Sequence, residues 1–464
     1  ARTMNVRTLT AAAAGALTLA TAGLAHGNPI ARVATGFIAS EVCSGTFISG
    51  LDPDRIYQET TGALSGAKYV TWAAHMSVDR AARTVSVTLF GGSRSVAAYT
   101  PGLGCRLVYG ARPAAANENA PGPAASRPDL VSGGPALGAI VETAFTEPAT
   151  GPRRNTHAIV IMRDGQVIAE RYAAGYGPST LVHGFSATKT VTATLIGILV
   201  RQGKLSLDQP APIAAWRGAG DPRGAITVGQ LLRHTSGLAM GDSFNGSLAS
   251  SLDRVNRMKF TQADMAGYAA ASPLGDPPGT HWTYQDGNYV LLGRLIGDAA
   301  GGGAGDVTAF ARRELFDPLG MGPVILETDT AGTFDGSTQM FARPRDWARF
   351  GQFLLDDGRV GETRILPDGW VKAAAEPTPG SRPGIGAGMW SNRGDSFGAR
   401  RRIDEGFPAD AYMARGMFGQ YVIVIPSRRL VIARFGISPG DGDEAGVARL
   451  VRDVVAMVDA EPRR

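Results

Sequence analysis

Apolar and polar residues alternate over short stretches in the first part of the chain. Between residues 42 and 109, stretches such as 85–89 alternate with a period of two and are separated by glycine and proline-glycine pairs. This period places one face of a strand against a core, and such pairs are typical of turns. The pattern therefore predicts a small β-rich domain at residues 26–110.

The second predicted domain, residues 131–464, has strands at both of its ends. Four apolar runs predict two hairpins, at 158–162 with 167–172 and at 421–425 with 430–435. Asp164-Gly165 between the first two runs is typical of a hairpin turn, and 444–458 has the period of an amphipathic helix. Helical patterns alternate with loops between the hairpins. We therefore expect an antiparallel sheet built from both ends of the domain, with a largely helical insertion.

Two segments lack the pattern of a packed domain. Residues 111–130 consist mainly of Ala, Pro, Asn and Gly, which predicts a linker. Residues 9–24 carry no charge, follow two arginines and end in small residues, so residues 1–25 are interpreted as a secretory signal peptide. A buried helix and a retained anchor are the alternatives, although the run is short for a membrane span. The signal predicts an exported protein, periplasmic or secreted, with no stable membrane span after its removal.

Composition and charge narrow the class of protein. The 464 residues suffice for two domains, and 44% hydrophobic with 19% charged residues is a globular composition. The net charge of +5 comes from arginines spread along the chain, and the one basic cluster, at 400–402, is followed by acidic residues. We therefore expect no nucleic-acid partner.

Cys43 and Cys105 are the only cysteines. In an exported protein two cysteines most simply form a disulfide, which here would close the β-rich domain. Two free buried cysteines and a two-cysteine metal site are the alternatives. The histidines lack the spacing of a metal motif, so we expect no metal.

Ser186 and Lys189 are the first candidates for chemistry, three residues apart at the start of a long apolar run. On a helix these side chains share a face, so Lys189 Nζ can reach Ser186 Oγ. A serine hydroxyl needs a base to become a nucleophile, and a lysine can serve if its pKa is lowered. The pattern also arises by chance: Ser65 and Lys68 repeat it, but lead into a β-like stretch without a helical register.

Other candidate residues are harder to interpret alone. Tyr284 lies just before a helical pattern, where a packed aromatic in a capping loop is the structural alternative. His183 precedes the serine by three positions and is interpreted as a loop or core residue. A Ser-His-Asp hydrolase would have glycine two positions after its serine, where this chain has Thr188.

Five ordered segments resemble the serine β-lactamase and penicillin-recognising superfamily, in its class C-like branch of esterases, D-amino-acid peptidases and 6-aminohexanoate-dimer hydrolases. They are FSATK at 185–189, GKLSLD at 203–208, LRHTSGL at 232–238, the Tyr284 segment ending LLG at 291–293, and RGMFGQY at 415–421. Two further segments, at 345–351 and 364–367, resemble the 6-aminohexanoate-dimer hydrolases. The resemblance implies an α/β (α+β) β-lactamase/transpeptidase-like fold, with an antiparallel sheet flanked by helices and a largely helical subdomain.

The resemblance also implies roles for particular residues. Ser186 would be the nucleophile, Lys189 its partner in proton removal, and Tyr284 the group that passes the proton to the leaving atom and later activates water. The amides of Ser186 and of a residue near Gly416, with Met417 the first candidate, would stabilise the oxyanion. The expected reaction is cleavage of a small-molecule amide or ester through an acyl-enzyme, without metal or organic cofactor. Whether Lys189 or Tyr284 takes the proton stays open.

Two departures from the family pattern bear on the substrate. Asp286 stands where many relatives have the asparagine of Tyr-x-Asn, and 414–419 replaces a Lys-Thr-Gly triplet. A carboxylate at 286 would disfavour a substrate carboxylate nearby, so efficient β-lactam hydrolysis is not expected. A penicillin-binding D,D-peptidase or β-lactamase, and a non-catalytic sensor or binding protein on the same scaffold, are the alternative functions. The sequence does not predict an oligomeric state.

Overall fold

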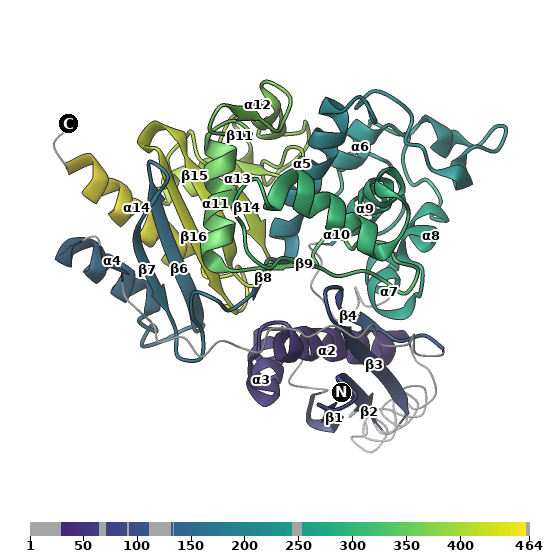
Figure 1. The fold of residues 1–464 in the computed structure, drawn as a ribbon, viewed down its shortest axis with the longest axis horizontal. Coiled ribbons are helices and arrows are strands. Elements are labelled where there is room, and N and C mark those ends of the chain that lie inside the picture. Colours follow the sequence, from purple (N-terminus) through teal and green to yellow (C-terminus); the bar gives the residue numbers. More distant parts are fainter. Residues whose placement is uncertain are drawn as a thin grey trace, which may run out of the picture.

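A seven-stranded antiparallel sheet forms one half of the larger part of the molecule (Figure 1). The computed structural model describes residues 29–64, 71–90, 92–110, 131–132, 134–243 and 253–460. The predicted signal peptide, 1–25, and the whole of the predicted linker, 111–130, lie outside these residues. In order across the sheet, the strands are β13 (Trp390–Ser391), β14 (Tyr412–Gly416), β15 (Gln420–Ile425), β16 (Leu430–Gly436), β6 (Thr156–Arg163), β7 (Gln166–Tyr172) and β5 (Val131–Ser132).

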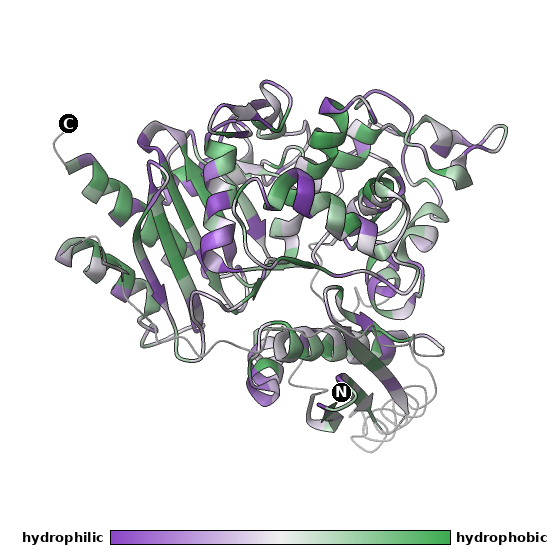
Figure 2. Cartoon of the chain, viewed as in Figure 1, coloured by the Kyte–Doolittle hydropathy of each residue, from purple (hydrophilic) through white to green (hydrophobic). Residues whose placement is uncertain are grey.

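The two predicted hairpins pair with each other at the centre of this sheet, where β16 lies against β6 with Ile432 opposite Ile161. Successive side chains of a strand point to opposite faces, and both faces of β6 are covered. Ile161 and the residues on the same face of β6 pack against α4 (Pro135–Phe145) and α14 (Glu444–Ala460). Val160 and the residues on the opposite face pack toward α11 (Pro344–Leu355) and the helical half. This explains why β6 is an uninterrupted apolar run, seen as one of the most hydrophobic strands in Figure 2.

The helical half lies between β7 and β14 in the sequence and beside the sheet in space (Figure 1). Its α-helices are α5 (Thr188–Arg201), α6 (Val228–Leu232), α7 (Arg254–Thr261), α8 (Met265–Ala270), α9 (Asp286–Ala300) and α10 (Ala304–Ala311), followed later in the chain by α12 (Trp370–Ala374) and α13 (Phe397–Asp404). A π-helix continues α10 at Arg312–Phe316. Short 3₁₀ helices occur at Thr71–Ala73, Phe185–Ala187, Ala214–Trp216, Pro222–Ala225 and Pro426–Arg428.

Two small sheets accompany the main sheet. One joins β8 (Val182–His183), β10 (Met340–Ala342) and β9 (Ile325–Leu326), and the other pairs β11 (Arg359–Val360) with β12 (Thr363–Arg364). The first small sheet lies at the junction of the main sheet and the helical half (Figure 1). The fold is therefore the expected mixture of an antiparallel sheet, flanking helices and a largely helical subdomain.

The N-terminal unit, residues 29–107, packs against this junction from one side, at the bottom of Figure 1. Its antiparallel sheet comprises β1 (Ala74–Asp79), β2 (Thr84–Leu89), β3 (Ser93–Thr100) and β4 (Gly104–Leu107), in that order. Alternate residues of β2 are buried against one helix, and the predicted disulfide is present between Cys43 of that helix and Cys105 of β4. The sheet was predicted, but the unit also contains two unpredicted helices, α2 (Pro29–Phe47) and α3 (Pro53–Ala63).

Glycine and threonine in α2 explain why this helix was missed, since both residues have low helix propensity. The glycines serve packing: a Cβ on Gly36 would lie 2.8 Å from the Phe260 carbonyl oxygen, and one on Gly45 would lie 2.5 Å from the Ile56 side chain. Tertiary contacts therefore override the local preference.

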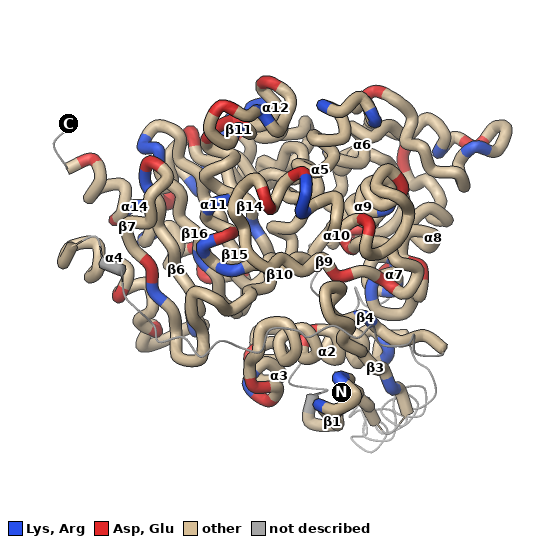
Figure 3. Tube along the Cα trace, viewed as in Figure 1, with Lys and Arg blue, Asp and Glu red and all other residues tan. Residues whose placement is uncertain are grey.

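Charged residues of both signs are interspersed over the molecule in Figure 3. In the part of the chain that the structure describes, no helix has the length and apolar character of a membrane span.

Candidate active site

A sharp turn between β8 and α5 presents Ser186 in a partly exposed position at the junction of the two halves. Phe185 adopts a positive φ of 46°, a strained conformation for a residue with a side chain. Its ring is buried against Ala63 of α3 and against Phe418, so packing compensates for the strain. Such an outlier is often found at functional positions.

Two glycines allow the backbone to pack closely around this turn. A Cβ on Gly184 would lie 2.3 Å from the buried indole of Trp347. A Cβ on Gly416, at the end of β14, would lie 2.2 Å from the Gly184 carbonyl oxygen and 3.1 Å from the Ser186 amide nitrogen. The edge of β14 therefore runs directly beside the amide of the candidate nucleophile.

Lys189 lies on the first turn of α5 with its side chain only 2% exposed. Its Nζ donates hydrogen bonds to Ser186 Oγ at 3.0 Å, to Asp286 Oδ1 at 2.7 Å and to the Ser337 carbonyl oxygen at 3.0 Å. The same ammonium lies 4.7 Å from the centre of the Tyr284 ring. The fold thus brings Tyr284 and Asp286, which are neighbours in the sequence, to the distant Ser186 around one buried cation.

The pKa of Lys189 shifts in the opposite direction from the one a lysine base requires. Burial lowers the pKa of this ammonium, but the charge of Asp286, followed by the interaction with Tyr284, outweighs burial and raises it above its ordinary value. Lys189 therefore carries its proton at neutral pH. A direct role as general base is disfavoured in this resting arrangement.

Asp286 begins α9, and its backbone amide donates to Ser243 Oγ at 3.0 Å. Its carboxylate is divided between two lysines, with Oδ1 2.7 Å from Lys189 Nζ and Oδ2 3.3 Å from Lys259 Nζ. Burial raises the pKa of Asp286, but these two cations lower it well below its ordinary range. The negative charge that was expected to repel a substrate carboxylate is thus neutralised within the protein.

Lys259 was missed by the sequence analysis. It lies on α7, in a part of the chain that matches none of the five motifs. The scarcity of lysine, only five in the chain, is the one signal in the sequence that could have drawn attention to it.

The motif at 232–238 supports the Tyr284 segment and α9 from behind. His234 Nδ1 accepts a hydrogen bond from the Gln285 amide at 3.2 Å, and the imidazole packs 4.7 Å from the Tyr284 ring. Ser236 Oγ donates to Asn288 Oδ1 at 2.7 Å. Burial, followed by the charge of Lys189, lowers the pKa of His234 to about 3, so this imidazole is neutral and acts as a fixed support.

Met417, the candidate second oxyanion residue, lies in the turn after β14 with its side chain 44% exposed. Gln420 Nε2 donates to the Met417 carbonyl oxygen at 2.9 Å, and Phe418 has a positive φ of 62°. These contacts fix the turn close to Gly416 and therefore close to the Ser186 amide.

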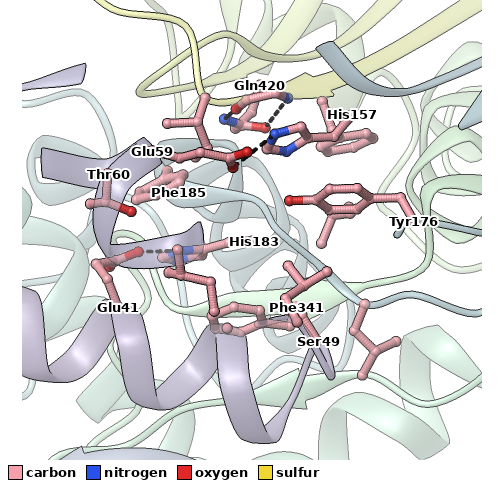
Figure 4. A pocket seen from close by; sticks show the side chains of 18 residues that line it. Glu41, Ser49, Glu59, Thr60, His157, Tyr176, His183, Phe185, Phe341 and Gln420 are labelled. Carbon is pink, nitrogen blue, oxygen red and sulfur yellow. Dashed lines mark hydrogen bonds and ion pairs between the residues drawn. The ribbon is translucent and has the colours of Figure 1, made fainter. Parts of the chain in front are cut away.

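A cavity of about 60 Å³ lies between the N-terminal unit and β8, the strand that leads to the Ser186 turn (Figure 4). Two acid-histidine pairs cross it: His183 Nδ1 lies 3.3 Å from Glu41 of α2, and His157 Nε2 lies 3.1 Å from Glu59 of α3. His183 also stacks on Phe185, with ring centres 3.8 Å apart. The cavity is thus a largely apolar gap in the interface behind the Ser186 turn, with these two polar pairs in its wall. No group of histidine, cysteine or acidic residues suited to a metal occurs among the residues described.

Comparison with known proteins gives one family match over most of the chain: the model described as Beta-lactamase matches residues 141–456. The 6-aminohexanoate-dimer hydrolase of Paenarthrobacter ureafaciens is 25% identical over 241 residues, which cover 47% of this chain and 56% of that protein. Protein Rv1367c of Mycobacterium tuberculosis is 31% identical over 232 residues, covering 40% of this chain and 57% of that protein. The chain thus spans little more than half the length of these curated relatives.

Solved structures give the same fold. The crystal structure of a penicillin-binding protein homologue from Caulobacter crescentus superposes with a TM-score of 0.54 at 20% sequence identity, and the match covers 71% of this chain and all (100%) of that one. At this level of identity the likeness concerns the fold alone.

Proposed function

The chain belongs to the beta-lactamase family, and from that premise we propose that it is a serine hydrolase that cleaves an amide or ester bond through an acyl-enzyme on Ser186. The observation that carries the proposal is the 3.0 Å hydrogen bond from a buried lysine ammonium to the hydroxyl of a partly exposed serine at a strained turn.

In the proposed acylation step, Lys189 keeps its proton and Tyr284 accepts the proton of Ser186. The proposed reactive form of Tyr284 is the phenolate, and the Lys189 ammonium lies 4.7 Å from the centre of its ring. As the proton leaves, Ser186 Oγ bonds to the substrate carbonyl carbon, and the carbonyl π electrons move to oxygen. Tyr284 then gives the proton to the leaving nitrogen or oxygen as its bond to carbon breaks.

Deacylation reverses these roles. Tyr284, again as phenolate, takes a proton from a water molecule, which attacks the acyl carbon. The ester bond to Ser186 breaks, and the serine oxygen receives the proton from Tyr284. The acid product leaves, and every group regains its starting protonation state.

Two backbone amides are proposed to stabilise the oxyanion, those of Ser186 and Met417. The closeness of β14 to the Ser186 amide, measured at Gly416, supports this pairing. The proposal predicts that the Met417 side chain, which is exposed, can be changed with little loss of activity.

The proposed substrate is a small-molecule amide or ester rather than a D-Ala-D-Ala peptide or a β-lactam. On the strand where a Lys-Thr-Gly triplet would stand, the one cationic side chain is Arg415. Its guanidinium lies 2.6 Å from Glu444 Oε2 and 4.6 Å from the Trp390 ring centre, so it is already engaged. A substrate carboxylate therefore gains little from it.

The domain organisation and location of the protein are proposals as well. We propose a hydrolase domain at 131–464 preceded by a disulfide-closed domain at 26–110, in an exported protein. The disulfide between Cys43 and Cys105 supports an oxidising compartment.

Turnover of a substrate panel tests the proposed function. p-Nitrophenyl esters, p-nitroanilides and a chromogenic cephalosporin would be compared on the wild type and Ser186→Ala. We expect ester or anilide hydrolysis that disappears in the variant while its far-UV circular dichroism is unchanged. Retained hydrolysis in Ser186→Ala would refute the nucleophile assignment, and preferential turnover of the cephalosporin would instead assign a β-lactamase.

A further inference from the structure

Lys259 is a second buried lysine at the candidate active site, and none of the motifs accounts for it. Its side chain is 8% exposed. The Nζ lies 3.3 Å from Asp286 Oδ2 and 3.4 Å from Asp335 Oδ2, and donates hydrogen bonds to Thr338 Oγ1 at 2.5 Å and to Ser337 Oγ at 3.4 Å. The ammonium is thus fully engaged by groups of the protein.

Two cations and two anions alternate in this cluster. Asp286 lies between Lys189 and Lys259, with one carboxylate oxygen toward each, and Asp335 lies on the far side of Lys259. A second connection runs through Ser337, whose hydroxyl donates to Asp335 and whose carbonyl oxygen accepts from Lys189. Each buried charge has a neighbour of opposite sign, which offsets the free-energy cost of removing it from water.

We propose that Lys259 is a positioning residue, which holds one oxygen of Asp286 and thereby keeps the Lys189 ammonium centred on Ser186 Oγ. The inference rests on the proposed function of Ser186 and Lys189. Lys259 itself does not contact the nucleophile in this arrangement; it acts through the shared carboxylate.

Geometry explains why a second cation is needed. Lys189 Nζ is closer to Asp286, at 2.7 Å, than to Ser186, at 3.0 Å. If Lys259 lost its charge, the whole charge of Asp286 would act on Lys189 and draw it from the serine. Lys259 therefore weakens the electrostatic attraction of Asp286 for Lys189.

The N-terminal unit helps to place Lys259. Phe260, the next residue, packs edge-on against Phe37 of α2 with ring centres 5.5 Å apart. The Phe260 backbone also lies against Gly36, where a Cβ would be only 2.8 Å from its carbonyl oxygen. Helix α7 is thus packed against α2 at the residue that follows Lys259.

The charged and titratable neighbours of Lys189 determine the direction in which its pKa should change in each variant. The titratable groups that face Lys189 are Asp286 on α9, Lys259 on α7, and Tyr284, Tyr289 and His234. Burial raises the pKa of Tyr289 and lowers that of His234, so both are neutral. Loss of the Lys259 charge should therefore raise the pKa of Lys189, and loss of the Asp286 charge should lower it.

The test is the rate at which an activated phosphonate labels Ser186, followed from neutral to alkaline pH. Lys259→Met and Lys259→Gln remove the charge, Lys259→Arg keeps it, and Asp286→Asn removes the shared anion. Lys372→Met, at an exposed position on α12, is the matched control. Glutamine retains hydrogen-bonding atoms, so it provides a folded neutral variant where methionine is poorly tolerated.

Both neutral variants should label at least about tenfold more slowly than the wild type, the lower range for loss of proton-transfer function. In both neutral variants, the alkaline limb of the pH profile of the labelling rate should move to higher pH. Lys259→Arg should restore both the labelling rate and the position of this limb. Asp286→Asn should move the limb to lower pH by about one unit or more. Adding Lys259→Gln to Asp286→Asn should cost less than it does in the wild type, because the shared carboxylate is gone.

The inference is overturned if Lys259→Gln is labelled at the wild-type rate and the alkaline limb of its pH profile does not move. It is also overturned if Lys259→Arg is labelled as slowly as Lys259→Gln. Equal losses from Lys259→Gln with and without Asp286→Asn would also overturn it. Failure of the proposed function looks different: the wild type would not be labelled, or Ser186→Ala would be labelled as well.

Discussion

Replacing Glu327 by glutamine should stabilise the protein, and the gain should grow with pH. Glu327 follows β9 and is 3% exposed at the interface with the N-terminal unit. Its Oε1 accepts hydrogen bonds from the Cys105 amide at 2.6 Å and from Ser44 Oγ at 2.8 Å. Burial raises the pKa of this carboxyl to about 8, although the two hydrogen bonds act in the opposite direction.

The sign and size of the effect follow from this pKa. Since the folded-state pKa of about 8 exceeds the ordinary 4.5, the carboxyl contributes stability that is complete below pH 4.5 and is lost as the pH rises to 8. At 1.36 kcal/mol per pH unit, the loss at pH 7 is about 3 kcal/mol. Glutamine keeps the oxygen that accepts both bonds and has no proton to lose, so it should recover about this amount.

Urea unfolding of the wild type and Glu327→Gln at pH 5 and at pH 8 would measure the difference. The control is Glu362→Gln, at an exposed turn position, which should change stability little at either pH. Hydrogen exchange of the Cys105 amide should report the same trend locally. A glutamine variant whose advantage is equal at both pH values, or which is less stable than the wild type at pH 8, would refute the reasoning.

Two further substitutions test the packing around the site. Gly184→Ala places a methyl group 2.3 Å from the Trp347 indole. Phosphonate labelling of Ser186 should therefore fall at least about tenfold, while the circular dichroism stays unchanged. Labelling at the wild-type rate would contradict the close packing proposed around this turn. Arg345→Met removes the cation bonded to Glu170, whose side chain is 0% exposed. Because Arg345 itself is 41% exposed, solvent screens the pair, and the free energy of unfolding should fall by about 1–3 kcal/mol in urea denaturation. An unchanged free energy of unfolding would contradict this expectation.

The fold was largely predictable because its sheet is encoded in local patterns. The runs at 158–172 and 421–435 are bounded by turn residues, and they form β6, β7, β15 and β16 as predicted. Helix α2 was not predicted, because its glycines serve contacts with Phe260 and Ile56 that no local pattern reveals. Local periodicity reports which face of an element is buried, but not which distant residue it meets.

The candidate site was likewise predictable only in part. The spacing of Ser186 and Lys189 predicts that their side chains come within reach, and they lie 3.0 Å apart. Lys259 has no fixed spacing to either residue and comes close only through the packing of α7. The direction of the Lys189 pKa shift was also beyond the sequence, because it depends on whether burial or the charge of Asp286 dominates.

The central claim, an activated serine at position 186, is tested most directly by the intact mass of the protein after exposure to an activated-serine phosphonate. The wild type, Ser186→Ala and Lys189→Ala would be treated side by side. The account predicts a single adduct on the folded wild type that is absent from both variants. An unlabelled wild type, or an adduct that persists in Ser186→Ala, would contradict it and favour a binding or sensor protein on the same scaffold.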